Sequence, residues 1–296
     1  MGYFELDNGK ITARIASFGA ELQSLKDAGS GREYMWSGDP AYWKRVSPVL
    51  FPLVGNYKNK KTSFGGQEYV MSQHGFARDR EFTRISGTDT EIWLALDSDE
   101  ETRKSYPFDF RLELGYRLKD RTLEVLWRVK NTDSRKIWFS IGGHPAFACP
   151  LNEEGNKDGY ALQFDTAGPV ETRIIGPDGL ATDEHEEYLL EDGRLPVKEA
   201  LFDRDALVLE GGQAHSLGLV DPKGNTFVTV RFDAPLSASG RRRGKMRLLS
   251  VLSPGMEDAI TGISTARWRN GNGAIPWKRA ANLTLPTASA CSIFKN

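Results

Sequence analysis

Cysteine, histidine and long apolar runs are all scarce in this chain. Its 296 residues include two cysteines, Cys149 and Cys291, and four histidines. Two cysteines so placed give neither a disulfide framework nor a zinc motif. No apolar run approaches the roughly 18 residues that a membrane-spanning helix needs, and the first residues lack the basic start and apolar stretch of a secretion signal. We therefore expect a soluble, cytoplasmic protein without a membrane partner.

Neither sign of charge is in excess over the whole chain, whose formal net charge is −1. A nearly neutral chain argues against a nucleic-acid partner. The charge is unevenly divided, however. Residues 237–296 contain 10 Lys and Arg against 2 Asp and Glu, a net +8, and the remaining 29 and 38 give residues 1–236 a net −9. The chain changes character near residue 236.

Helical periodicity is rare, and period-two alternation takes its place. Apolar and polar side chains alternate in 111–119 and again in 123–130, with a tight turn between, which predicts a β-hairpin. Many short strands separated by turns predict an all-β protein, an antiparallel β-sandwich. We expect one domain over residues 1–236 and an atypical tail, 237–296, that is not an independent domain. Further strands are predicted at 11–15, 91–96, 206–209 and 226–232, and a two-turn helix at 100–105.

Two of the four histidines stand in similar local frames. His144 lies in the stretch 141–147, Ile-Gly-Gly-His-Pro-Ala-Phe, and His74 in 73–78, Gln-His-Gly-Phe-Ala-Arg. Glycine lets the backbone approach another group closely, proline fixes the direction of the chain, and imidazole titrates near neutral pH. Either stretch alone is also explained as a turn with a packed histidine. Their similarity indicates one shared site.

A third stretch places aromatic rings beside a basic pair. Residues 42–55 begin with Tyr42, Trp43, Lys44 and Arg45, and their two prolines and glycine predict a shaped loop rather than a strand. Flat apolar rings and fixed donors suit a sugar, whose ring faces are apolar and whose edges carry hydroxyls. The alternative is an aromatic corner of the core with a solvated Lys-Arg pair.

Three further polar residues have simpler explanations. Asp205, in the stretch 202–207, is either a site residue or an acid at the edge of a strand. His185 lies in an acidic, solvated run, and nothing beyond two preceding glycines marks His215. We keep Asp205 as a candidate and leave both histidines out of the site.

Together these stretches resemble the aldose 1-epimerase (galactose mutarotase-like) family, in its bacterial hexose-phosphate-type branch. The resemblance rests on 45–52, Arg-Val-Ser-Pro-Val-Leu-Phe-Pro, followed in order by 73–78, 141–147 and 205–207, and covers about residues 1–236. It implies a β-supersandwich with a sugar cleft on one sheet face and no metal or organic cofactor. The implied activity interconverts the α and β anomers of a hexose or hexose 6-phosphate. The expected partner is a small sugar, and we expect a monomer or a dimer.

The resemblance also implies roles for individual residues. His144 would be the general acid at the ring oxygen, and His74 would hydrogen-bond the same region. Arg45 would hold a hydroxyl, Asp205 would accept from hydroxyls, and Arg78 would bind a phosphate through two of its guanidinium nitrogens. A positioned acid or base contributes on the order of 10²–10⁴ in rate.

The family's general base, a glutamate in a C-terminal Glu-Pro-Trp motif, is missing from this chain. Glu257, the one glutamate beyond residue 236, is a weak candidate in its place. A frameshift just after Leu236 would explain both the missing motif and the change of charge. One choice of codons for 251–257, read from its third base, encodes Ile-Glu-Pro-Trp-Tyr-Gly. We expect residues 237–296 to be out of frame and to pack poorly, leaving a sheet edge open.

Three functions fit these observations to different degrees. The first is a mutarotase, and the second is a sugar-binding or catalytically impaired remnant that keeps the histidines without the base. The third, a polysaccharide-processing β-sandwich, would use paired carboxylates, and the sequence offers no convincing pair. Sequencing the gene across codons 230–260 separates the first two.

Overall fold

The computed structural model describes residues 2–150, 159–204, 206–232, 236–242, 245–252 and 278–284. Regular structure in these residues is almost entirely antiparallel β, so the predicted all-β fold is confirmed. The predicted helix at 100–105 is shorter, because α1 covers Glu100–Arg103. No helix in the described ranges is long and apolar enough to cross a membrane. Three 3₁₀ turns complete the helical segments: η1 (Lys58–Lys60), η2 (Ala77–Asp79) and η3 (Glu199–Phe202).

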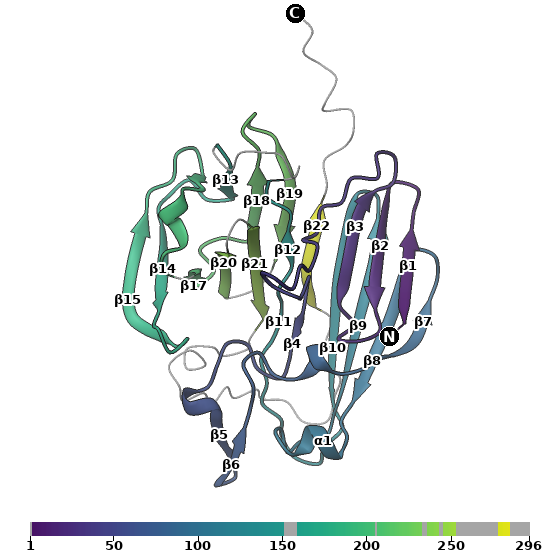
Figure 1. Ribbon diagram of the computed structural model, residues 1–296. Helices are drawn as coiled ribbons and strands as arrows, with labels where there is room; N and C mark the ends of the chain where they lie inside the picture. Colours follow the sequence, from purple (N-terminus) through teal and green to yellow (C-terminus); the bar gives the residue numbers. More distant parts are fainter. Residues whose placement is uncertain are drawn as a thin grey trace, which may run out of the picture.

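Two large sheets form the body of the molecule (Figure 1). The nine-stranded sheet has the order β16 (Arg194–Pro196), β13 (Ala161–Phe164), β18 (Ser216–Val220), β19 (Thr226–Arg231), β22 (Lys278–Thr284), β10 (Thr122–Asn131), β9 (Phe110–Lys119), β8 (Glu91–Asp97) and β7 (Thr83–Gly87). The eight-stranded sheet runs β15 (Ala181–Tyr188), β14 (Val170–Ile175), β17 (Leu207–Glu210), β20 (Leu236–Arg242), β21 (Lys245–Leu252), β11 (Ile141–Gly143) and β4 (Val49–Leu50), and β12 (Ala146–Phe147) also pairs with β21.

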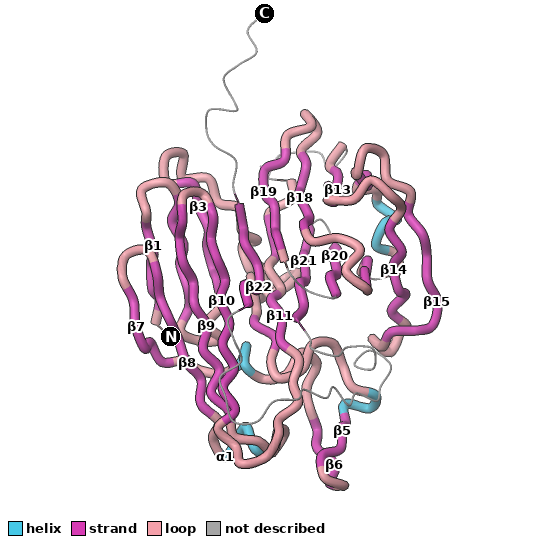
Figure 2. Tube along the Cα trace, turned by 180° about the vertical axis from the view of Figure 1, so that it is seen from behind, coloured by secondary structure: helices cyan, strands magenta, loops and turns pink. Residues whose placement is uncertain are grey.

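Two smaller sheets flank this body. A three-stranded sheet, β1 (Tyr3–Asp7), β2 (Ile11–Ala16) and β3 (Leu22–Asp27), lies beside β7–β10, as both views show (Figures 1 and 2). The Tyr116 hydroxyl on β9 donates to the Ala20 carbonyl at 2.6 Å and so ties the two sheets together. The hairpin of β5 (Lys61–Phe64) and β6 (Gln67–Val70) projects from one end.

The predicted hairpin is present as β9 and β10, paired from Thr122 with Lys119 to Asn131 with Phe110. Its apolar residues face the core as the alternation requires. Glu113 is a polar position that differs from a half-exposed strand, because it is 2% exposed. Cations on the same sheet face cover its carboxylate, and burial of a charge is tolerated when it is paired in this way. The cations within ion-pair distance of Glu113 are Arg111, Arg128 and Lys130.

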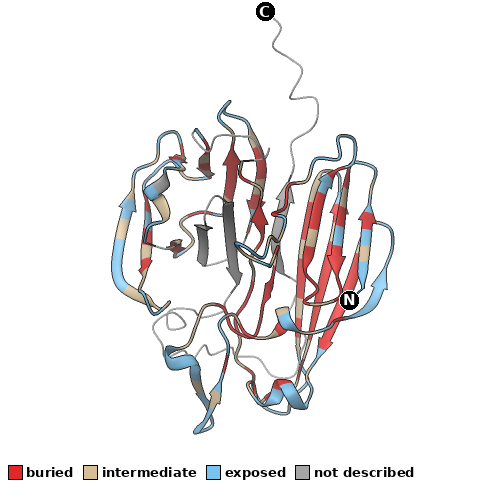
Figure 3. Ribbon diagram, viewed as in Figure 1, coloured by how far each residue is buried: buried red, intermediate tan, exposed pale blue. Residues whose placement is uncertain are grey.

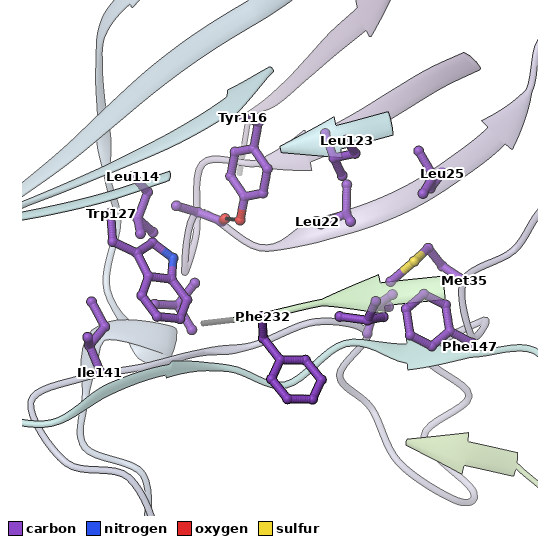
Figure 4. Close-up of a cluster of buried hydrophobic side chains, with 14 of the residues drawn as sticks. Leu22, Leu25, Met35, Leu114, Tyr116, Leu123, Trp127, Ile141, Phe147 and Phe232 are labelled. Atoms are coloured by element: carbon purple, nitrogen blue, oxygen red, sulfur yellow. Dashed lines mark hydrogen bonds between the residues drawn. The ribbon is translucent and has the colours of Figure 1, made fainter. Parts of the chain in front are cut away.

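One hydrophobic core connects the sheets and reaches the segment that carries His144. Buried residues lie along the central strands, whereas β15, β5 and β6 are largely exposed (Figure 3). In the close-up, Trp127 and Ile141 lie together, and Met35 lies beside Phe147 (Figure 4). Ile141 and Phe147 stand on either side of His144 in the chain. Core packing therefore fixes both ends of the His144 turn.

Residues 237–296 supply part of both large sheets. β20 and β21 form a hairpin within the eight-stranded sheet, and β22 pairs with β10 on one side and β19 on the other. Arg241 and Arg242 do not alternate with apolar residues, yet they pair with Met246 and Lys245 of β21. Backbone pairing with a neighbour outweighs the side-chain pattern there. The frameshift remains a prediction.

Candidate functional site

The site is built around residues 45–55, which we call the central segment. The sequence predicts a shaped loop here, and the structure departs from that at Val49 and Leu50, which form the short strand β4. β4 pairs with β11, with Gly143 opposite Val49 and Gly142 opposite Leu50. The central segment thus has hydrogen-bonded neighbours that arrive from distant parts of the chain.

His144 is held along one side of the central segment. Its backbone N–H donates to the Pro48 carbonyl at 3.1 Å, and the Ala146 N–H donates to the Val46 carbonyl at 2.9 Å. Gly143 precedes it, and a Cβ there would lie 3.4 Å from the Trp127 ring, so the strand packs closely against the core. The Gly-Gly-His-Pro frame therefore fixes the position of one imidazole.

His74 is held along the other side. Its N–H donates to the Gly55 carbonyl at 2.8 Å, and the Gly55 N–H donates back to His74 Nδ1 at 3.0 Å. After Gly75, the amides of Phe76 and Ala77 both donate to the Phe51 carbonyl. The side chain and the backbone of His74 are thus fixed together.

Glycine is required between these contacts. Gly75 has a φ of +69°, and a Cβ built there would lie 2.2 Å from the Phe51 carbonyl oxygen. No L-residue fits in that space, and the left-handed conformation adds a further penalty. The glycine that follows His74 in the sequence therefore marks the close approach of two backbones.

The two histidine rings meet at the central segment. Their centroids are 6.0 Å apart, with an interplanar angle of 81°. The Trp43 ring lies 5.1 Å from the His144 ring at 41°. An indole beside two imidazoles gives an apolar surface next to polar ring nitrogens. This combination suits a ligand with flat apolar faces and hydroxyl edges.

His74 is neutral at ordinary pH. Burial lowers its pKa most, and the positive charges of His144, Arg78 and Arg45 lower it further, to about 3. Because Nδ1 accepts the Gly55 N–H, the ring proton is on Nε2. His74 is therefore a neutral hydrogen-bond donor.

This low pKa predicts a pH dependence of stability. Below about pH 6.5 the unfolded chain protonates His74, whereas the folded chain does not until about pH 3. The unfolded state binds more protons between these values, so the free energy of unfolding falls as the pH falls through this range. His74→Asn should flatten that slope, because asparagine keeps an acceptor near Nδ1 and tolerates the φ of +65° found here.

Denaturant unfolding at pH 7, 6, 5 and 4 measures this slope. His185→Asn is the matched control, since His185 is exposed on β15. The control should follow the parent protein. Parallel curves for the parent and His74→Asn would contradict the expected linkage.

Two arginines complete the described part of the site. The Arg45 guanidinium donates to the Arg78 carbonyl at 3.2 Å and to the Asp79 carboxylate at 2.5 Å. The Arg78 guanidinium donates to the Gln73 carbonyl at 2.5 Å. Burial and the charge of Arg45 lower the pKa of Arg78. With side chains only 16% and 17% exposed, the pair concentrates positive charge in a small volume.

The other residues considered from the sequence are Asp205, Glu257, His185 and His215. Asp205 and Glu257 lie outside the described residues. The His215 N–H donates to Asp165, and the His185 ring lies 3.9 Å from the Glu210 carboxylate. Within the described ranges, no group of three or more His, Cys, Asp or Glu side chains could hold a metal ion.

Sequence reasoning missed one buried residue beside the site. Glu21, 6% exposed, accepts hydrogen bonds from two amides of the central segment. Its sequence signal is weak, because an acidic residue between a turn and a strand is ordinary. The Gly19-Ala20 pair before it was the available hint, since a tight turn precedes a close contact.

A family model for aldose 1-epimerase matches residues 3–224. The chain belongs to the aldose 1-epimerase family. The match includes both histidine stretches and both arginines, and it ends before residue 236, where the charge changes. Family membership and the fold predicted with it are therefore confirmed.

Three similar proteins come from Lactococcus lactis and from two Lactobacillus species. The plasmid-encoded protein LacX of Lactococcus lactis subsp. lactis is 30% identical over 237 residues, which cover 77% of this chain and 79% of LacX. The galactose mutarotase related enzyme from Lactobacillus acidophilus has a TM-score of 0.85 at 28% identity, covering 97% of this chain and 98% of its own. A galactose mutarotase-like protein from Lactobacillus casei has a TM-score of 0.82 at 29% identity, covering 96% and 100%.

Proposed function

We propose that this member of the aldose 1-epimerase family interconverts the α and β anomers of a hexose or a hexose 6-phosphate. The observation that carries the proposal is the ring cluster on the central segment. His144 lies between the Trp43 and His74 rings, and Arg45 and Arg78 stand close enough to lower the pKa of His74.

The chemistry needs two proton transfers. Opening the hexose ring requires a proton on the ring oxygen and removal of one from the anomeric hydroxyl; closure from the other face of the aldehyde gives the second anomer. His144 delivers the ring-oxygen proton, because its ring is fixed at the site and His74 stays neutral. His74 donates a hydrogen bond from Nε2 to the same oxygen and stabilises charge that develops there.

The other roles belong to sugar binding and to the base. Arg45 holds a hydroxyl, Arg78 binds a 6-phosphate where one is present, and Asp205 accepts from hydroxyls. The base that takes the anomeric proton has no assigned residue, and Glu257 is the weak candidate for it. The missing Glu-Pro-Trp motif favours the alternative, a sugar-binding protein with little or no epimerase activity.

One pair of measurements separates the two functions. Polarimetry on a freshly dissolved α-hexose follows anomer exchange, and ligand-observed NMR with the same sugar follows binding. Exchange faster than the buffer rate supports the epimerase. Binding without faster exchange supports the sugar-binding protein. If neither binding nor faster exchange is observed, both functions lose their support.

Arg78 should distinguish a phosphorylated sugar from a free one. Arg78→Ala is expected to weaken binding of a hexose 6-phosphate more than binding of the free hexose, because only the phosphate gains a charged, bidentate contact. Such a contact is worth roughly 1.5–3 kcal/mol, a loss of about 10- to 150-fold in affinity. Calorimetric titration with both sugars measures the difference.

The exposed Arg14 on β2 provides the matched control. Arg14→Ala removes one positive charge at a distance from the central segment and should leave both affinities unchanged. An equal loss for both sugars in Arg78→Ala would assign this arginine to hydroxyl binding or to the loop itself, where it already bonds the Gln73 carbonyl.

A further inference from the structure

A buried carboxylate, that of Glu21, also bonds the central segment. Glu21 follows the turn between β2 and β3 and is 6% exposed. One carboxylate oxygen accepts the Val46 N–H at 2.7 Å and the Ser47 N–H at 2.8 Å. A buried charge is costly unless such bonds compensate it. These two bonds therefore hold the Glu21 carboxylate and the backbone after Arg45 together.

The same stretch of backbone bonds the His144 segment through its carbonyls. Val46 accepts from Ala146 at 2.9 Å, and Pro48 accepts from His144 at 3.1 Å. A continuous path of hydrogen bonds thus runs from the Glu21 carboxylate through residues 46–48 to the His144 backbone. A shift of the carboxylate would move both partners of that path.

The turn that carries Glu21 also contacts the arginine loop. The Gly19 N–H donates to the Arg80 carbonyl at 2.7 Å, and a Cβ on Gly19 would lie 2.9 Å from the Arg78 carbonyl oxygen. That oxygen accepts from Arg45. The turn is itself fixed by Tyr116, whose ring lies in the core (Figure 4) and whose hydroxyl donates to the Ala20 carbonyl. One rigid turn therefore contacts both arginine-bearing segments.

Charge complements this geometry. Burial raises the pKa of Glu21, whereas the two backbone N–H groups and the charge of Arg45 act in the opposite direction. Two partly buried guanidinium groups next to each other repel, and a nearby carboxylate reduces that repulsion. Glu21 thus offsets positive charge at the place where the site concentrates it.

We infer that Glu21 is a positioning residue of the site: its carboxylate aligns residues 45–48 with His144 and with the two arginines, and it does not itself touch the sugar. The catalytic consequence of this inference rests on the proposed function. The coupling of the Glu21 turn to the His144 backbone does not depend on any activity and can be measured without it.

Hydrogen exchange of the backbone amides tests that coupling in the full chain without a sugar. Glu21→Ala removes the oxygen that accepts from both amides, so the amides of Val46 and Ser47 should exchange at least about 10-fold faster. The amides of His144 and Ala146 should follow, although their own acceptors are unchanged. Glu21→Gln keeps a carbonyl oxygen and should restore most of the protection. If Glu21→Ala does not fold, Glu21→Asp, which withdraws the carboxylate by one methylene, takes its place.

Glu113→Ala is the matched control, because Glu113 is another buried glutamate, on β9. In Glu113→Ala, hydrogen exchange of the amides at 144–146 should change only as far as the variant's global stability changes. Faster exchange confined to Val46 and Ser47 would overturn the inference, as would an increase at 144–146 no larger than in the control. Sugar binding by the parent protein is measured separately, so a failure of the proposed function would not be mistaken for a failure of the coupling.

Discussion

Replacing His144 by alanine is expected to lower the turnover of anomer exchange by at least about 100-fold, because a positioned general acid contributes on the order of 10²–10⁴ in rate. Polarimetry on fresh α-hexose measures this in a version of the chain whose reading frame is restored after Leu236, where a base is available. Binding of the sugar should change much less than turnover, since proton delivery acts in the transition state.

The control for this substitution is His215→Ala. His215 is exposed and bonds Asp165 through its backbone, so its side chain should be dispensable. Turnover of His144→Ala within a few-fold of the parent would remove His144 from the mechanism. Comparable losses in both variants would indicate damage to the fold rather than to proton transfer.

Restoring the frame should raise mutarotation by at least about 100-fold over the chain as written, because it returns a general base. In the restored reading, the glutamate codon takes its bases from those of Leu252 and Ser253. Leu252 ends β21 and is the partner of Ile141 on β11. Strands rise about 3.3 Å per residue, so that glutamate would start roughly 10 Å along the sheet from His144. A hexose fits between an acid and a base so separated.

The mutarotation rates of both versions decide the question, together with the gene sequence across codons 230–260. Limited proteolysis beyond residue 236 reports whether the restored strands pack better. Equal rates and equal resistance to protease would refute the frameshift and make Glu257 the leading candidate for the base.

Local sequence patterns predicted the structural features that depend on residues close together in the chain. Alternation in 111–119 and 123–130 gave the β9–β10 hairpin, since side chains on a strand must choose between core and solvent. The glycine after His74 indicated a close backbone approach, which the Phe51 carbonyl provides. The similar frames of His74 and His144 predicted a shared site, and their rings meet.

Features that depend on distant partners were not readable from the sequence. Nothing in the composition near Glu21 shows that its carboxylate bonds Val46 and Ser47, because the contact joins two turns that are far apart in the chain. The same holds for the short strand β4, which exists because β11 arrives beside it. The basic residues of β20 form a strand through pairing with β21 and not through their own pattern.

The place of β22 has a consequence for synthesis of the protein. This strand, Lys278–Thr284, bridges β10 and β19, and its Leu283 pairs with Leu123, 160 positions earlier. A growing chain therefore cannot unite the two halves of its larger sheet until residues 278–284 have left the ribosome. Until then β10 and β19 both present open edges, where unpaired strands from other chains can add. Protection of these edges during translation, by a chaperone or by slow elongation, is thus more important here than in a fold whose last strand lies on the rim.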